Sequence, residues 1–448
     1  MLTACGTTTS KTGAKISTTQ KIHLTMWGLF DDPSVWQPII QQYQSQHPNI
    51  TVDYQQKSFA DYEDDSLNAL AARTGPDIWL VRNDWIDQHA DKLVAAPAAL
   101  FATKTASGVA GYAELFPDVA VHDAIVGDKI YGLPLSIDTL VLYYNKALLQ
   151  TKRSDLDRAG DQTNDLRQAP VTWNDAIKDA TLLTQKDGSR ITQAGLALGA
   201  PNVAAGQDIL AALMLQRGTT MVAADRKSAA FNLPQLDSSG RSTVPGKDAL
   251  DFYRSFADPK SANYSWPEDF PDSLSAFEQG KVAMMINYGY LANQLKQDVP
   301  TLNFGSYAFP QIAGKITSVD FASYWLETVT NSSKSPDVAW DFLAFALQND
   351  SSYQQASGRP GNKRPAITSL PATLPDRAVF GNPLDFQRAS AASWYKGLRP
   401  LKTDDLFAAL IRSVASGTDS AHALDATATQ LTALLQEQTP TAPATTTK

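Results

Sequence analysis

The sequence has a single cysteine, Cys5, so no disulfide bond can form within the chain. Lysine and arginine form no basic block and the formal net charge is −8, which gives no support for nucleic-acid binding. No apolar run approaches the ~18 residues that a membrane-spanning helix needs. The five histidines are scattered, without the spacing of metal ligands. The motifs G-x-S-x-G, H-E-x-x-H and G-x-x-x-x-G-K-[ST] are missing, so we expect no enzyme, no metal and no cofactor.

The chain is long enough for more than one hydrophobic core. It has 448 residues, of which 43% are hydrophobic and 19% charged, as in ordinary soluble globular proteins. This length predicts two domains or more. Several of the nine tryptophans lie beside turn signals rather than inside apolar periods. Their placement favours a ligand cleft, although large cores also use tryptophan.

The N-terminal part predicts alternating strands and helices. Strands are expected at Ile22–Trp27, Ile50–Gln56 and Gly75–Val81. Asp32 followed by proline marks the start of the first helix, and a second helix is expected over about residues 60–73. This β-α-β-α-β order predicts a parallel, doubly wound sheet of the α/β class.

The stretch from Gly127 to Leu149 carries the most specific pattern. Gly127 and Asp128 form a hairpin turn signal, and the apolar run Leu140–Asn145 predicts a buried strand. Asp138 lies between them and either caps a turn or points into a cleft. Further along, polar segments 151–170 and 236–245 are expected to be surface loops, and helices are expected over residues 336–348, 403–416 and 419–438.

These residues resemble the bacterial extracellular solute-binding proteins of family 1, which are receptors of ABC transporters. In that family a segment like G-K-x-Y-G-x-P, an acidic residue and L-x-Y-N-K form the first crossing between two lobes, and this chain has GDKIYGLP, Asp138 and LVLYYNK. Other segments match in family order: Ile50–Gln56, Gly75–Val81, Val171–Ile177, Phe277–Asn287 and Ser332–Leu347. Together the matches span nearly all of residues 21–435.

The resemblance implies a two-lobe, type II periplasmic-binding-protein-like α/β fold, in which each lobe is a mixed sheet flanked by helices and hinge crossings join the lobes. Lobe one is expected at residues 21–137 plus 320–375, and lobe two at 138–319 plus 376–438. Residues 1–20 are expected to form a lipobox and polar tether, and 439–448 a disordered tail.

The resemblance also implies a function. The protein is expected to bind a carbohydrate between its lobes by hinge closure, as a monomer, and to deliver it to the permease subunits of an ABC importer. The alternatives are a receptor for another solute, such as a polyol phosphate, a polyamine or iron, and a secreted carbohydrate-active enzyme.

Sugar recognition needs hydrogen-bonding groups for hydroxyls and an aromatic plate for the C–H face of the ring. Open α/β sheets place ligands beyond the carboxyl ends of their strands. Helix capping is an equally good interpretation of Asp32 and Asp84. The strand ends and the first crossing supply these candidate contacts: Trp27, Asp31, Asp32, Asn83, Asp84 and Asp138.

By the resemblance, Asp84 and Asp138 match acidic ligand contacts, and Tyr290 takes the place of a stacking aromatic that is often tryptophan. The second crossing supplies Tyr324 and Trp325. Strand alternation sends one of this pair into the core, and we prefer Trp325 for the ligand. The last candidates, in predicted loops, are Trp266 and Arg359.

Cys5 follows Leu-Thr-Ala and precedes glycine, which resembles a bacterial lipobox. The charged and apolar parts of a signal peptide are missing upstream, so we expect that Met1 lies inside the true signal peptide or that the sequence was trimmed. Lipidation of Cys5 would anchor the protein at the outer side of the bacterial cell membrane, in an extracytoplasmic location, with no other contact with the membrane.

Overall fold

The computed structural model describes residues 20–161, 166, 168–237, 239–315, 317–358 and 387–437, and the backbone of residues 7–9 and 15–17. The chain divides into two compact units. Unit 1 comprises Met1–Thr139, Ala322–Thr368 and Ala391–Ser393, and unit 2 comprises Leu140–Phe321, Ser369–Ser390 and Trp394–Lys448. The sequence analysis placed the first two divisions after residues 137 and 319. Its third division, after residue 375, and its disordered tail lie outside the described residues.

Unit 1 is built on a mixed sheet with strand order β4-β3-β5-β18-β6, and β9 also pairs with β18. Strands β3, β4 and β5 are parallel, whereas β18 is antiparallel to β5. The predicted β-α-β-α-β order is therefore confirmed. The strands are β3 (Ile22–Gly28), β4 (Ile50–Gln56), β5 (Ile78–Arg82), β6 (Leu93–Val94), β9 (Leu133–Pro134) and β18 (Trp325–Thr330).

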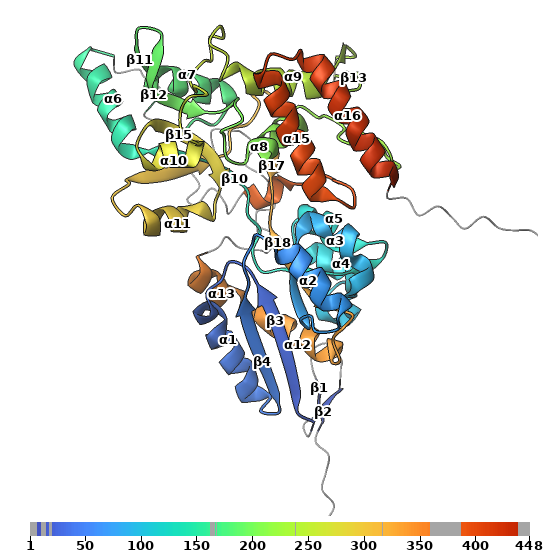
Figure 1. Ribbon diagram of the computed structural model, residues 1–448. Helices are drawn as coiled ribbons and strands as arrows, with labels where there is room; N and C mark the ends of the chain where they lie inside the picture. Colours follow the sequence, from blue (N-terminus) through green and yellow to red (C-terminus); the bar gives the residue numbers. More distant parts are fainter. Residues whose placement is uncertain are drawn as a thin grey trace, which may run out of the picture. The chain divides into compact units, whose positions relative to one another are not determined.

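Helix α1 (Pro33–Gln46) packs alongside β4 (Figure 1). Asp32 is its N-cap, because the side chain accepts a 2.8 Å hydrogen bond from the backbone N–H of Ser34, and proline follows at the first helical position. The capping interpretation of Asp32 is thus confirmed. The other helices of unit 1 are α2 (Tyr62–Ala71), α3 (Ile86–His89), α4 (Gly108–Leu115), α5 (Asp118–Ala124), α12 (Pro336–Gln348) and α13 (Asp350–Ser357), with short 3₁₀ turns at Asn83–Trp85, Ala90–Lys92 and Ala98–Phe101.

The predicted hairpin at Gly127 is present. Strands β7 (Ile125–Val126) and β8 (Lys129–Ile130) pair antiparallel around it. Gly127 has a φ of +67°, a left-handed conformation that glycine adopts without the steric cost of a Cβ.

Unit 2 contains a second mixed sheet, with strand order β11-β12-β15-β10-β16. Strand β10 (Leu140–Asn145) has the predicted bounds and lies between antiparallel neighbours β15 and β16, while β12 is parallel to β15. The remaining strands are β11 (Gln185–Asp187), β12 (Arg190–Ala197), β15 (Val282–Tyr288) and β16 (Phe304–Ala308).

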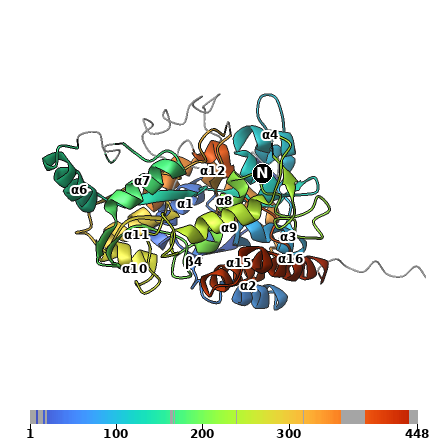
Figure 2. The same cartoon turned by 90° about the horizontal axis from the view of Figure 1, so that it is seen from above.

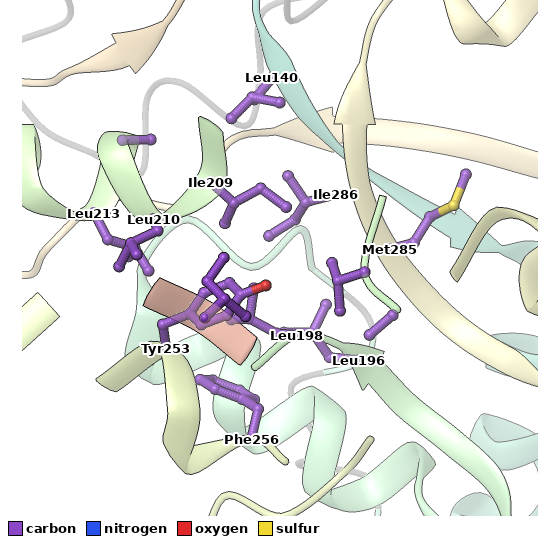
Figure 3. Packing of buried hydrophobic residues seen from close by; sticks show 14 of the residues in the cluster. Leu140, Leu196, Leu198, Ile209, Leu210, Leu213, Tyr253, Phe256, Met285 and Ile286 are labelled. Atoms are coloured by element: carbon purple, nitrogen blue, oxygen red, sulfur yellow. The ribbon is translucent and has the colours of Figure 1, made fainter. Parts of the chain in front are cut away.

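The core of unit 2 forms where helices cover this sheet. Figure 3 shows Leu140, Leu196 and Ile286 of the strands in one cluster with Ile209 of helix α8 (Gly206–Gln216) and Phe256, which follows helix α9 (Pro245–Ser255). All five side chains are fully buried. Figure 2 shows α15 next to α16, and α8 next to α9. The helices are α7 (Trp173–Leu183), α8 (Gly206–Gln216), α9 (Pro245–Ser255), α10 (Ser273–Glu278), α11 (Leu291–Asp298), α15 (Pro400–Ala415) and α16 (Ser420–Glu437), with a 3₁₀ turn at Arg388–Ser390.

Three segments expected to be irregular contain regular structure. Helix α6 runs over Lys146–Arg158, so the surface loop predicted from residue 151 is wrong up to residue 158. Asn145 caps α6 through hydrogen bonds from two backbone N–H groups. Short antiparallel pairs also occur within or beside the expected loops: β1 (Thr7–Thr9) with β2 (Lys15–Ser17), and β13 (Gln235–Leu236) with β14 (Ser242–Thr243). The two-residue strands β17 (Asp320–Phe321) and β19 (Ala391–Ala392) complete the elements.

Candidate functional site

The carboxyl ends of the parallel strands of unit 1 meet at one edge of its sheet. Trp27 is next to last in β3, Lys57 directly follows β4, and Arg82 ends β5. The backbone N–H of Lys57 donates a 2.8 Å hydrogen bond to the carbonyl of Gly28, which holds these two strand ends together. Trp325 starts the antiparallel strand β18 opposite Arg82, so it reaches the same edge.

Five aromatic rings gather at this edge, and we call them the aromatic face. Trp325 is its centre: the centroid of its ring lies 5.4 Å from that of Phe30, 6.3 Å from Phe59, 6.2 Å from Tyr62 and 5.3 Å from Trp85. All four neighbours meet Trp325 edge to face, at interplanar angles between 68° and 74°. Tyr62 and Trp85 are buried, whereas Phe30 is 42% and Phe59 61% exposed. The face therefore presents apolar ring surface to solvent.

A cavity of about 290 Å³ adjoins the aromatic face within unit 1. The ammonium of Lys57 lies 3.9 Å from the centroid of the Trp27 ring and donates a 3.0 Å hydrogen bond to Gln55 Oε1. Within the described chain, Trp27 Nε1 and Ser66 Oγ are buried without a hydrogen-bond partner. A polar ligand in the cavity could satisfy such groups. The lining residues are Trp27, Lys57, Ser58, Tyr62, Asp65 and Ser66.

Tyr324 and Trp325 point to opposite sides, as strand alternation predicts. Tyr324 is buried, and its hydroxyl donates a 3.0 Å hydrogen bond to Asp123 Oδ2. Burial, together with the charge of Asp123, raises the pKa of Tyr324 well above its ordinary value. Asn83 is also buried, and its side-chain amide donates a 2.8 Å hydrogen bond to the same carboxylate oxygen. Tyr324 and Asn83 thus belong to an internal polar network, and Trp325 is the member of the pair on the aromatic face.

Each candidate carboxylate of unit 1 takes part in internal bonding. Asp31 Oδ2 accepts a 2.7 Å hydrogen bond from the hydroxyl of Tyr353, and Asp84 forms a two-point ion pair with Arg82. Asp138 is buried, and its Oδ1 accepts a 2.8 Å hydrogen bond from the backbone N–H that follows it. Asp138 lies one residue before the end of the first segment of unit 1.

Unit 2 offers a smaller group at the end of β15. Tyr290 is 45% exposed, and its ring lies 6.3 Å from that of Tyr288 at an interplanar angle of 15°. The hydroxyl of Tyr288 donates a 2.8 Å hydrogen bond to Asp208 Oδ2. The buried ammonium of Lys396 lies 3.7 Å from Asp208 Oδ1 and 2.6 Å from Asp404 Oδ1. An exposed tyrosine therefore lies beside a charge network that is centred on the buried Lys396.

Three of the sequence candidates do not join these groups. Trp266 is fully buried in the core of unit 2, and its Nε1 donates a 2.8 Å hydrogen bond to Asn202, so we leave it out of the proposed site. Arg359 and Cys5 lie outside the described residues. The described residues contain no group of three or more side chains that could hold a metal ion. None of the helices that they form is long and apolar enough to cross a membrane.

Several site residues were missed by the sequence analysis. Phe30 and Phe59 lie in the loops directly after β3 and β4, where strand ends alone could have marked them. Asp208 and Lys396 carry no sequence signal, because they are far apart along the chain and only the tertiary fold brings them together.

A family model described as bacterial extracellular solute-binding protein matches residues 27–352. A putative binding protein of Brucella abortus is 24% identical over 347 residues, which are 75% of each protein. The maltodextrin-binding protein MdxE of Bacillus subtilis is 26% identical over 57% of this chain and 54% of its own length.

Two solved structures share the fold. The sugar-binding protein MalE of Xanthomonas citri matches with a TM-score of 0.72 and 19% identity, over 93% of this chain and 98% of its own. The cyclic alpha-maltosyl-1,6-maltose binding protein of Arthrobacter globiformis matches with a TM-score of 0.70 and 19% identity, over 93% and 99%. The fold is that of the type II periplasmic binding proteins, as the sequence predicted.

Proposed function

The chain belongs to the family of bacterial extracellular solute-binding proteins, and from this membership we propose that it binds a carbohydrate. The observation that carries the proposal is the aromatic face, in which Phe30 and Phe59 expose ring surface around Trp325 at the carboxyl edge of the parallel strands. Two similar proteins, one with maltodextrin-binding and one with sugar-binding in its name, support the choice of a carbohydrate.

The chemistry of the face suits a sugar. The C–H face of a pyranose packs on an aromatic ring, and its hydroxyls need donors and acceptors close by. The neighbouring cavity supplies both, since Lys57 and Trp27 Nε1 donate, Asp65 accepts, and Ser66 can do either. From unit 2 we assign Tyr290 as a second stacking ring.

As part of this proposal, the two units close around the sugar. Candidate contacts come from both units, and the chain passes from one to the other after Thr139, beside Asp138, and after Phe321, shortly before Trp325. A ligand shifts such an equilibrium only through its better affinity for the closed state. Small-angle X-ray scattering should show a smaller radius of gyration with saturating sugar, and an unchanged radius would argue for a rigid site.

Membership of the family implies an extracytoplasmic location. We further propose that Cys5 carries a lipid anchor and that the protein, as a monomer, delivers its ligand to the permease subunits of an ABC importer. The polar residues after Cys5 would then act as the tether.

A thermal-shift screen tests the proposed function directly. A ligand that binds only the native state raises the apparent Tm, so neutral mono- and oligosaccharides are compared with polyol phosphates, polyamines and ferric iron. A shift confined to one of the other solutes would replace the carbohydrate proposal. Chromatography of an oligosaccharide after long incubation checks the enzyme alternative, and we expect the sugar to be recovered unchanged.

A further inference from the structure

A second cavity, of about 420 Å³, lies in unit 2 against helix α6 and strands β10 and β16. The lining residues are Tyr144, Lys146, Leu149, Gln150, Arg153, Ser154, Asp157 and Tyr307. It is at the other end of the sheet from Tyr290: β10 begins opposite Tyr288 and ends beside Phe304, and the cavity lies at that second end. The cavity is therefore separate from the proposed carbohydrate contacts of unit 2.

Two stacked tyrosines form one wall of this cavity. The rings of Tyr144 and Tyr307 are 4.0 Å apart at an interplanar angle of 9°. They are diagonal neighbours on one face of the β10–β16 pair, because Tyr144 pairs with Gly305 and Leu142 pairs with Tyr307. A Cβ on Gly305 would lie 2.6 Å from the Tyr144 ring, so glycine at this position leaves room for the ring to lie across β16.

Two cations, Lys146 and Arg153, and one carboxylate, Asp157, line the cavity. Within the described part of the chain, neither Lys146 nor Arg153 forms a salt bridge, and Arg153 is only partly exposed. Arg153 acts on Tyr307 electrostatically: burial raises the pKa of that phenol, Tyr144 and the charge of Asp179 add to the rise, and the guanidinium of Arg153 opposes it. Asp157 is the one acidic group among the described lining residues, so the lining as a whole is positively charged. This is notable in a chain with a net charge of −8.

From this geometry we propose that the cavity binds an oxyanion, a carboxylate or a phosphate carried by a small molecule, as a second ligand of the protein. The guanidinium of Arg153 can hold two oxygens of one oxyanion, and Lys146 adds a point charge. The tyrosine hydroxyls can donate further hydrogen bonds. A water molecule occupies about 30 Å³ in the liquid, so the cavity has room for the oxyanion and the carbon skeleton to which it is attached.

The test measures the binding of citrate and of inorganic phosphate by isothermal titration at constant ionic strength, with chloride as the balancing anion. Binding of citrate alone assigns a carboxylate, and binding of phosphate alone assigns a phosphate. If neither binds to the unaltered protein, the proposal is overturned. Binding that survives in every variant below means an adventitious ion only and also overturns it.

Four variants locate the site. Arg153→Gln should weaken binding by about tenfold or more, because a hydrogen bond to a charged group is lost. Lys146→Gln should weaken it less, and Gly305→Ala should weaken it by displacing Tyr144 without changing any charge. Lys152→Gln is the matched control, since it removes one positive charge from the same helix but does not line the cavity. Equal losses in Lys152→Gln and Arg153→Gln would show that only the overall charge matters and would refute the site.

Discussion

The hydroxyl of Tyr324 donates a 3.0 Å hydrogen bond to Asp123 Oδ2 in the interior of unit 1, although 201 positions separate the two residues. The same carboxylate accepts hydrogen bonds from Asn83 at 2.8 Å and from Ser393 at 2.5 Å. The buried Asp123 in helix α5 thus connects the end of β5, the start of β18 and the last segment of unit 1, Ala391–Ser393. This network fixes the backbone that turns Trp325 onto the aromatic face.

Tyr324→Phe should lower the free energy of unfolding by about 1 to 3 kcal/mol, since a charged buried acceptor loses one of its donors. Urea denaturation at neutral pH measures this change. Tyr131→Phe is the control, because it removes a hydroxyl from a partly exposed tyrosine of the same unit. Equal urea midpoints for the two variants would show that the Asp123 network adds nothing to stability.

Trp325→Ala should weaken binding of the sugar found by the thermal-shift screen by about 1 to 3 kcal/mol, as expected for a central aromatic contact. Trp325→Phe should keep part of the affinity, because it retains a ring. Leu236→Ala, at an apolar residue that is 75% exposed in unit 2, is the control and should bind normally. If alanine at position 325, and in turn at Trp27 and Tyr290, leaves the affinity unchanged, the assigned site is wrong.

Asp138→Asn should weaken sugar binding with little loss of stability. Asparagine has nearly the same shape, and its side-chain oxygen can still accept the hydrogen bond from the backbone N–H of Thr139. A carboxylate, however, accepts stronger hydrogen bonds from sugar hydroxyls than an amide does. Calorimetric titration and thermal unfolding are measured on the same sample. A large drop in Tm with unchanged affinity would make Asp138 a structural residue.

Cys5 should carry lipid when the protein is isolated from its native host. The residues Leu-Thr-Ala before the cysteine and the polar residues after it motivate this prediction. Mass spectrometry of the mature protein measures the modification directly. An unmodified thiol, or a mature N-terminus at another residue, would contradict it.

Asp272→Ala should destabilise the protein by about 1 kcal/mol at pH 7, because the side chain of Asp272 caps α10 through the backbone N–H groups of Leu274 and Ser275. Asp272 is exposed, and what desolvation it has acts to raise its pKa, but hydrogen bonds from Ser275 and Leu274 outweigh this and hold the pKa below the ordinary value of 3.8. The stabilisation is therefore complete above that ordinary value and is lost as the pH falls through the lower, folded-state pKa.

The difference in unfolding free energy between Asp272→Ala and the unaltered protein should accordingly shrink below about pH 4. Asp272→Asn keeps a capping oxygen at every pH and is the control. Denaturation curves between pH 7 and pH 2.5 give the comparison, and a difference that stays constant down to pH 2.5 would contradict the assigned role.

Local patterns were enough to predict much of the fold. Strands β4 and β10 and helix α12 have their predicted bounds, because apolar periodicity and proline or asparagine at the ends define them within a few residues. Most of helix α6 was predicted to be a loop because the helix is mostly solvated, and Leu149 is its one buried residue in the described structure. Asn145 is both the last residue of strand β10 and the N-cap of α6, and the sequence pattern indicates only the strand.

The candidate site was less accessible from sequence. Alternation along the chain predicts that one of Tyr324 and Trp325 is buried, and the structure shows that it is Tyr324. Phe59 follows the end of β4 closely, but only the tertiary fold brings its ring 6.3 Å from that of Trp325. The contact between Asp208 and Lys396 could not be predicted from the sequence for the same reason. Positions defined by their place along one strand are accessible from the sequence, and positions defined by packing between distant segments are not.

The position of β18 has a consequence for biosynthesis. In the sheet of unit 1 it lies between β5 and β6, yet in the chain it follows all of β7 to β17. While the ribosome is still making the middle of the protein, the first half of unit 1 has no strand to join β5 to β6, and the edge of β5 stays unpaired. Unit 2 likewise waits for α15 and α16. Neither unit can finish folding until most of the polypeptide has been synthesised, so a chain that stops before β18 has neither a complete sheet in unit 1 nor a complete helical layer in unit 2.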